Sequence, residues 1–308
     1  MQCRITKGFT LVELLVTVSI IGILMAMVFG ALHAAQNSAR EAATKATIAK
    51  LNGIVMERMN SYLTRRVPIR LEFCPSKHAD GTPYTHDEQV EWFRMNAKTR
   101  LAAIRDLQRM EMPERFADVV DAPATLPNNV TVPDPQLHRL YASKYAAKKP
   151  SDDNNHAECL YILVSLGSPE AMEQFRQNEI GDTDNDGWPE FIDGWGKPIY
   201  WLRWAPGCAK SNSNGYSGIQ SGDVVNDHDP FDTIKVDSSG FHLIPLIWSY
   251  GRSGAKNVDV GKDVHFSSST SAMIAPDTIC GPGYYVNNGA ATDDSAKGNI
   301  TNHSVESR

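Results

Sequence analysis

The sequence lacks the patterns that mark common enzymes and nucleic-acid-binding proteins. Its 308 residues contain no nucleotide-binding glycine loop, no His-Glu-x-x-His motif and no Cys-x-x-Cys motif, and its nine histidines are scattered. Lysine and arginine form no dense cluster, and the formal net charge is −6, whereas nucleic-acid-binding proteins carry clustered positive charge. We therefore expect neither an enzyme nor a protein that binds nucleic acid.

Cysteine is also scarce, with five residues, of which Cys3 lies near the N-terminus. Outside the cytoplasm, the other four cysteines can form two disulfides, and any four cysteines allow three pairings among which a sequence cannot choose. Free buried thiols are the alternative. The candidate disulfide residues are Cys74, Cys159, Cys208 and Cys280.

Long hydrophobic runs are rare as well, because only one occurs, from Phe9 to Ala31, and Glu13 is its only charged residue. As a helix, its first 22 residues would be about 33 Å long, which is enough to cross a bilayer. Arg4 and Lys7 precede the run, and positive charge on this short end favours a cytoplasmic N-terminus with the rest of the chain translocated. A cleavable secretory signal is the alternative, since "AMVFGALHAAQNSA" can supply a small-residue cleavage site.

The stretch "KGFTLVE", residues 7–13, resembles the class III signal of type IV pilins and type II secretion pseudopilins. The resemblance implies that a prepilin peptidase cuts between Gly8 and Phe9 on the cytoplasmic side and that the new Phe9 amine is N-methylated. The apolar helix would then be kept as a single-pass anchor in the inner membrane, with the bulk of the chain in the periplasm. Other pilin or pseudopilin subunits and an inner-membrane assembly platform are the implied partners, and a periplasmic or extracellular fibre is the implied product.

Glu13 acquires a physical role under this interpretation. A carboxylate within a membrane helix costs about 2.5–3.5 kcal/mol on the mildest scale. In a staggered bundle of helices, Glu13 of one subunit can pair with the Phe9 amine of its neighbour, so that two charges that are costly alone compensate each other. An acid that reaches out to the membrane interface is the alternative.

The helix is expected to continue beyond the membrane. Five apolar residues are spaced by three or four positions and share one helical face: Ile48, Leu51, Val55, Met59 and Tyr62. Pro68 ends the pattern. The sequence thus predicts one helix of roughly 55 residues, half of it membrane anchor and half amphipathic spine.

Further helices are expected downstream, the first with Asp87 as a candidate N-cap and the others at about 137–148, 155–167 and 169–178. The basic residues of the first are expected to form a solvated face rather than a binding patch: Lys98, Arg100, Arg105 and Arg109. In the C-terminal third, "KPIYWLRW" and "FHLIPLIWSYG" favour strands.

The expected fold class is α+β and pilin-like, with a long N-terminal helix, a helical insert and a small C-terminal antiparallel sheet. "DGWGKPIYW" and "WSYGRSG" resemble a turn and the closing strand of major pseudopilins, so the chain is closest to a major-pseudopilin-like protein with a helical insert. The expected segments are a leader peptide at 1–8, the transmembrane half of the helix at 9–31, its amphipathic half at 32–67, a mainly helical insert at 68–180, a calcium-loop and small-sheet region at 181–286 and a polar tail at 287–308.

The stretch "GDTDNDGWPEFIDGWGKP" has carboxylates at alternate positions, followed by a glycine at 187. This spacing is typical of an EF-hand-type Ca²⁺ loop, in which alternate residues direct their oxygens to one point. The expected ligands are Asp182, Asp184, Asp186, the carbonyl of Trp188, Glu190 and Asp193. Glycines and a proline after the loop exclude a regular exit helix, so a stand-alone loop is expected, and an acidic turn without metal is the alternative.

Two functions remain open at this point. The first is a structural subunit of a type II secretion pseudopilus or a type IV pilus-like fibre. The second is a minor pilin whose insert binds DNA, a surface or secreted cargo. The sequence does not separate a pseudopilus from a pilus, or a major from a minor subunit.

Overall fold

The computed structural model describes residues 11–72, 74–151, 153–204, 228–236, 244–254, 256 and 299–302. Gly8, Phe9, Cys208 and Cys280 lie outside these residues. The helices are α1 Leu11–Thr64, α2 His86–Glu111, α3 Phe116–Val120, α4 Gln136–Ala147 and α5 Asn155–Gly167, with the 3₁₀ turns η1 Pro127–Asn129, η2 Pro169–Gln174 and η3 Gln177–Glu179. The strands are β1 Thr125–Leu126, β2 Val130–Thr131, β3 Ile180–Gly181, β4 Glu190–Phe191, β5 Tyr200–Leu202, β6 Leu246–Ser249 and β7 Ile300–Thr301.

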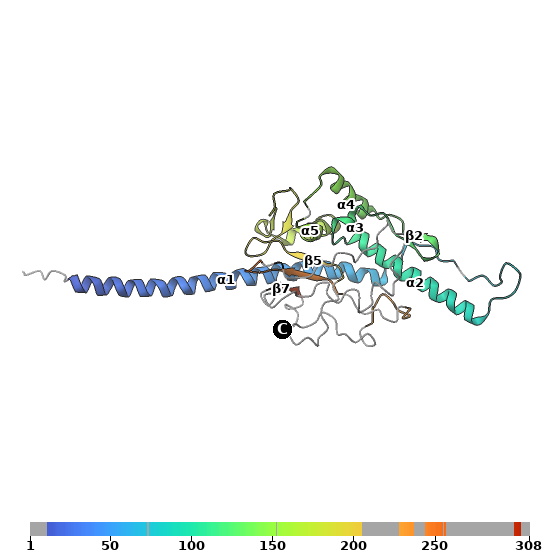
Figure 1. Cartoon of the computed structure of the whole chain (residues 1–308), viewed down its shortest axis with the longest axis horizontal. Coiled ribbons are helices and arrows are strands. Elements are labelled where there is room, and N and C mark those ends of the chain that lie inside the picture. The colour runs from blue at the N-terminus through green and yellow to red at the C-terminus, as the bar shows by residue number, and fades with distance from the viewer. Residues whose placement is uncertain are drawn as a thin grey trace, which may run out of the picture.

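Helix α1 is one uninterrupted helix of 54 residues, as the sequence predicts. Its first half projects away from the molecule and its second half lies among the other elements (Figure 1). The five residues of the predicted apolar face are all buried, with at most 4% of each exposed. The amphipathic spine is therefore confirmed, and it ends before Pro68.

A three-stranded antiparallel sheet, in the order β5-β6-β7, packs on the second half of α1. One of its faces contributes Trp201, Ile247 and Ile300 to the main core, which also contains the buried face of α1. Its other face packs Tyr200 and Trp248 near the start of α5. The fold is thus α+β and pilin-like, with the sheet against the outer half of the long helix.

Strand β7 comes from the segment that the sequence analysis placed in a polar tail. Ile300 is only 5% exposed, and it pairs with Ser249 of β6. Asn302, which follows the strand directly, reinforces the pairing, because its Nδ2 donates to the carbonyl of Pro245 at 2.9 Å and its Oδ1 accepts from the N–H of Ile247. A single apolar residue flanked by polar ones carries too little pattern for a sequence to reveal such a strand.

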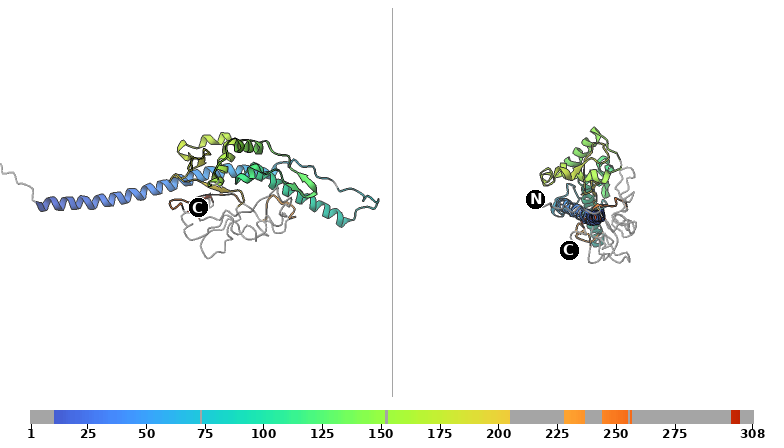
Figure 2. Two further views of the ribbon diagram at one scale, coloured as in Figure 1. Left: turned by 45° about the horizontal axis from the view of Figure 1, so that its top comes forward. Right: turned by 90° about the vertical axis from the view of Figure 1, so that its left-hand side faces the viewer.

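The helical insert lies largely on one side of α1, with α4 and α5 together in both views (Figures 1 and 2). The observed α4 and α5 agree with the predicted segments at 137–148 and 155–167, and short 3₁₀ turns η2 and η3 occupy the predicted segment at 169–178. The cap of α2 differs from the prediction. Thr85, not Asp87, is the N-cap, and it forms a capping box with Glu88.

The predicted solvated face of α2 is wrong for two of its four basic residues. Arg105 is 2% exposed and Arg109 is fully buried. Arg105 pairs with Asp229 at 2.9 Å, and Arg109 pairs with Asp106 at 2.9 Å and donates to the carbonyl of Ala122. The physical reason is that every residue from 101 to 111 is buried, so charged side chains in this half of α2 find their partners inside the protein.

Candidate functional site

The first half of α1 exposes a continuous apolar surface. Its large hydrophobic residues between Leu11 and Leu32 are 47–80% exposed. Its most apolar 18-residue window has a mean hydropathy of 2.5, and none of this window is buried. Exposure of an apolar surface of this extent to water is energetically unfavourable. The helix is long and apolar enough to span a membrane.

The polar residues of this segment are arranged in a way that lowers the free-energy cost of placing them in lipid. Thr17 donates to the carbonyl of Leu14 and Ser19 to that of Leu15, both at 2.8 Å, so these hydroxyls are satisfied within the helix. Glu13 lies in the first turn of α1, where the helix dipole favours a negative charge. The predicted cleavage residues Gly8 and Phe9 precede the described residues, so their placement stays a prediction.

Comparison with known proteins identifies the same segment. Residues 3–29 match the family model described as the prokaryotic N-terminal methylation motif. No curated protein and no solved structure shows significant similarity to the chain.

A membrane-length helix that starts at this motif and continues into an α+β domain defines a membrane-anchored protein of the pilin type. This motif supports a place for the chain among type IV pilin-like proteins. The motif marks a pilin-like precursor that prepilin peptidase processes and that assembles with other pilin subunits. The family is structural rather than enzymatic.

The predicted Ca²⁺ loop connects β3 and β4, which pair as an antiparallel hairpin. Within it, Asp182, Asp184 and Asp186 each have a carboxylate oxygen within 4.8 Å of the others. Two residues with positive φ shape the turn, Asn185 at 62° and Gly187 at 87°. The alternating acids therefore converge as the sequence predicts, because this backbone brings them to one side of a tight loop.

A second group of carboxylates shares Asp184 with the first and adds Glu158 of α5 and Glu190 of β4, again with oxygens within 4.8 Å of one another. Glu190 is fully buried and accepts from the N–H of Thr183 at 3.0 Å. Burial raises its pKa to about 7. Glu158 is also fully buried, and burial, reinforced by the charges of Asp186 and Asp184, raises its pKa to about 9.

Sequence reasoning missed Glu158. It lies 24 positions before the loop begins, outside any loop motif, so spacing within the loop could not reveal it. The available signal was an acid inside an apolar helix, "AECLYILV", where a charge that faces the core is costly without a partner.

Asp193, the expected last ligand of the loop, belongs to neither group of carboxylates. Its Oδ1 accepts from the N–H groups of Trp195 and Lys197 at 2.8 and 2.9 Å, and its Oδ2 accepts from Ser249 at 2.6 Å. Asp193 thus shapes the turn that leads into β5. Trp188 has a buried indole whose Nε1 donates to the carbonyl of Lys148 at 3.0 Å.

The turn after Asp193 rests directly on α1 because Gly194 has no side chain. Its N–H donates to Thr44 Oγ1 at 2.9 Å, and a Cβ at this position would lie 2.5 Å from the carbonyl oxygen of Arg40. We expect Gly194→Ala to lower the free energy of unfolding by about 1–3 kcal/mol, since the helix backbone cannot give way. Thermal unfolding of the full chain in detergent measures this.

Gly53→Ala is the matched control for that substitution, because a Cβ there meets no atom within 4 Å. It lies inside α1, so the change should leave stability unaltered or raise it by up to about 1 kcal/mol. Equal stability of the Gly194 variant and the wild type would contradict the close approach of turn and helix.

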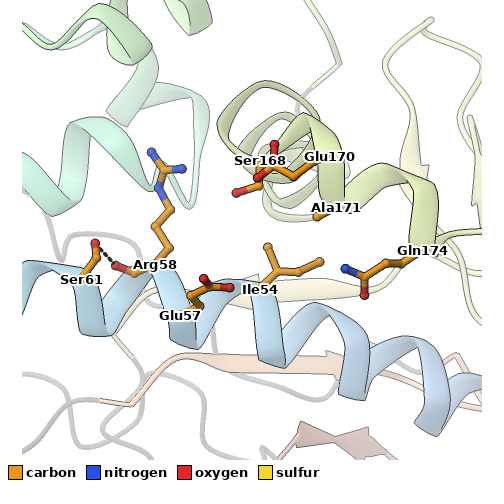
Figure 3. A pocket seen from close by; sticks show the side chains of 8 residues that line it. All are labelled: Ile54, Glu57, Arg58, Ser61, Ser168, Glu170, Ala171 and Gln174. Atoms are coloured by element: carbon orange, nitrogen blue, oxygen red, sulfur yellow. Dashed lines mark hydrogen bonds between the residues drawn. The ribbon is translucent and has the colours of Figure 1, made fainter.

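The described residues also form a pocket of about 420 Å³ between α1 and η2, lined by Ile54, Glu57, Arg58, Ser61, Ser168, Glu170, Ala171 and Gln174 (Figure 3). Arg58 donates to the carbonyl of Gly167 at 2.9 Å, and Ser61 donates to the carbonyl of Arg58 at 2.7 Å. These two groups therefore support the local structure of the helices.

Two of the candidate disulfide residues lie in the described part of the chain. Cys74 is half-buried and Cys159 is fully buried, and both are free cysteines. Burial raises the pKa of the Cys159 thiol well above its ordinary value. Cys159 therefore behaves as a small core residue, in agreement with the alternative of free buried thiols.

Proposed function

We propose that the protein is a structural subunit that prepilin peptidase cleaves and N-methylates and that then assembles into a type II secretion pseudopilus or a type IV pilus-like fibre. The single observation that carries the proposal is the methylation motif at residues 3–29, placed directly before a helix that is both membrane anchor and spine. The subunit is inserted once in the inner membrane, with its N-terminus in the cytoplasm and its folded part in the periplasm.

The continuity of α1 supports retention of the apolar segment. A secretory peptidase that cut after the apolar run would cleave within an uninterrupted helix whose second half lies in the core. A cut between Gly8 and Phe9 lies before the described start of this helix and leaves it whole. The exposed apolar half is then covered by lipid before assembly and by the helices of neighbouring subunits afterwards.

Substitution of Gly8 tests the processing step. We expect Gly8→Leu to block cleavage, because the peptidase must accommodate the residue before the cut, so that a chain eight residues longer accumulates in the inner membrane. Intact-mass measurement of the wild type should show a chain that begins at methylated Phe9.

Gly22→Leu is the matched control, since it places the same side chain on the exposed apolar helix, where a Cβ meets no atom within 4 Å. This variant should be processed like the wild type. A wild-type N-terminus downstream of Ala31 would overturn the proposal and support an ordinary secretory signal.

A further inference from the structure

The structure assigns a Ca²⁺ site to the loop between β3 and β4 together with Glu158 of α5. Its ligands are the carboxylates of the two groups that share Asp184: Glu158, Asp182, Asp184, Asp186 and Glu190. Asp193 is excluded from the ligands. The inference concerns the folded domain, so it stands independently of how the N-terminus is processed.

The observation that points to a cation is the state of Glu158. Its side chain is fully buried, and neither carboxylate oxygen accepts a hydrogen bond from any donor in the described part of the chain. A buried carboxylate without a donor is among the most costly groups in a protein, and a bound cation removes that cost. One of its oxygens lies within 4.8 Å of an oxygen of Asp184 and an oxygen of Glu190, so the carboxylate is directed at the other acids.

No basic side chain in the described part of the chain is ion-paired with this cluster. None of its five acids forms an ion pair among the described residues. The ammonium of Lys144 lies over the rings of Trp188 at 4.9 Å and Tyr161 at 5.5 Å, and that of Lys148 lies beside Gly187 of the loop, but neither forms an ion pair with the five acids. Five carboxylates held this close without an ion pair repel one another when they are ionised, and a bound divalent ion reverses that repulsion.

The chemistry of the donors favours Ca²⁺ over other divalent ions. All donors are carboxylate oxygens, with neither histidine nor cysteine among them, and hard oxygen ligands suit Ca²⁺ and Mg²⁺. Ca²⁺ accepts six to eight oxygens in variable geometry, whereas Mg²⁺ demands a near-ideal octahedron of shorter bonds. A crowded cluster drawn from a loop, a strand and a helix fits the larger, more tolerant ion.

Such an ion would join parts that are distant in the sequence. The loop already contacts the segment before α5, because Ser151 Oγ donates to Asp184 at 2.6 Å and the N–H of Ser151 donates to Asp186. Coordination by Glu158 adds the helix itself, which packs against β4 and β5. Calcium would thus fasten the loop to the core of the domain, and binding would be coupled to folding.

The test uses the full chain in detergent, freed of metal with a chelator and then supplied with CaCl₂. Unfolding should shift upward by about 5 °C when free Ca²⁺ exceeds the dissociation constant about 100-fold. Tb³⁺, a Ca²⁺ substitute, should luminesce on tryptophan excitation, because Trp188 lies within the loop. Equal melting temperatures with CaCl₂ and with chelator, or an equal shift with MgCl₂, would overturn the inference.

Two conservative variants test the ligand set itself. Glu158→Gln keeps the shape of the side chain and should weaken Ca²⁺ binding at least about tenfold, because it removes a charged ligand. Asp193→Asn keeps an acceptor for Trp195 and Lys197, so its Ca²⁺ affinity should stay within about twofold of wild type. Glu173→Gln, at an exposed glutamate, is the matched control and should bind like wild type.

The reverse pattern, with wild-type affinity in Glu158→Gln and a large loss in Asp193→Asn, would overturn the assignment in favour of a loop that uses its twelfth position. Circular dichroism before each titration confirms that a variant is folded. If Glu158→Gln unfolds, the comparison of wild type with Asp193→Asn still decides, since a loss in Asp193→Asn alone overturns the ligand set.

Discussion

Replacing Arg203 with methionine is expected to lower the free energy of unfolding by about 3–5 kcal/mol, because it removes one side of a buried charge cluster. Arg203 is fully buried and follows the last residue of β5. Its Nη1 donates to the carbonyl of Met112 at 2.6 Å and to Asp118 Oδ2 at 3.0 Å. The guanidinium therefore both stabilises the C-terminal end of α2 and neutralises a buried acid.

The acids that Arg203 neutralises make its loss costly. Glu114 and Asp118 are each 1% exposed, and the N–H of Arg203 donates to Glu114 Oε2 at 2.8 Å. Without the guanidinium both carboxylates stay buried near each other with less compensation. Because β5 belongs to the sheet and α2 and α3 to the insert, the expected instability would loosen the junction between these two parts.

Urea denaturation of the full chain in detergent measures the effect. Arg94→Met, at an exposed arginine of α2, is the matched control and should change stability by less than about 0.5 kcal/mol. Adding Glu114→Gln and Asp118→Asn to the Arg203 variant should recover part of the loss, since the unpaired charges are then removed. A change below about 1 kcal/mol in Arg203→Met would show that the cluster does not hold the two parts together.

Local patterns were sufficient to predict the elements that carry most of the fold. The spacing of Leu51, Val55 and Met59 defined the buried face of α1, and the aromatic stretches around Trp201 and Trp248 located β5 and β6. Each of these signals is contained in a few neighbouring residues. Periodicity and β propensity act at that range, so the structure confirms them.

Interactions across long stretches of sequence could not be predicted in this way. Arg105 finds Asp229 at a separation of 124 residues, and nothing around either residue identifies the other. From sequence alone, the four basic residues of α2 therefore suggest a solvated face, and only the folded structure shows which of them are buried. Arg203 is a similar case, since its partners come from the end of α2 and from α3.

In the carboxylate site, too, the ligands that are close in the sequence were predicted and the distant one was not. The alternation of Asp182, Asp184 and Asp186 is local, and the structure brings these three side chains together. Position twelve was assigned by analogy, but the β turn that follows the loop engages Asp193 in backbone hydrogen bonds. Glu158 comes from a separate helix, so only the folded chain reveals it.

Glu13→Ala is expected to insert and be processed normally but to reduce fibre yield at least about tenfold. A carboxylate within a membrane helix costs about 2.5–3.5 kcal/mol, and a chain that keeps one there gains from pairing it with a cation. We propose that the Phe9 amine created by cleavage is that cation in the neighbouring subunit. Loss of the acid leaves each amine without its partner in the bundle, and every 1.4 kcal/mol lost corresponds to a tenfold change in association.

Sheared-fibre yield, compared with the amount of mature subunit in the membrane, measures this assembly step separately from folding. Glu41→Ala is the matched control, because Glu41 is exposed on the same helix beyond the apolar run and, among the described residues, forms an ion pair with Lys45 one turn away at 2.6 Å. Glu13→Asp should assemble better than Glu13→Ala, since it keeps the charge on a shorter side chain. Because the exposed half of α1 packs against no other part of the described chain, a normal fibre yield from Glu13→Ala would mean that apolar contacts alone set the register of the bundle, and the pairing argument would fall.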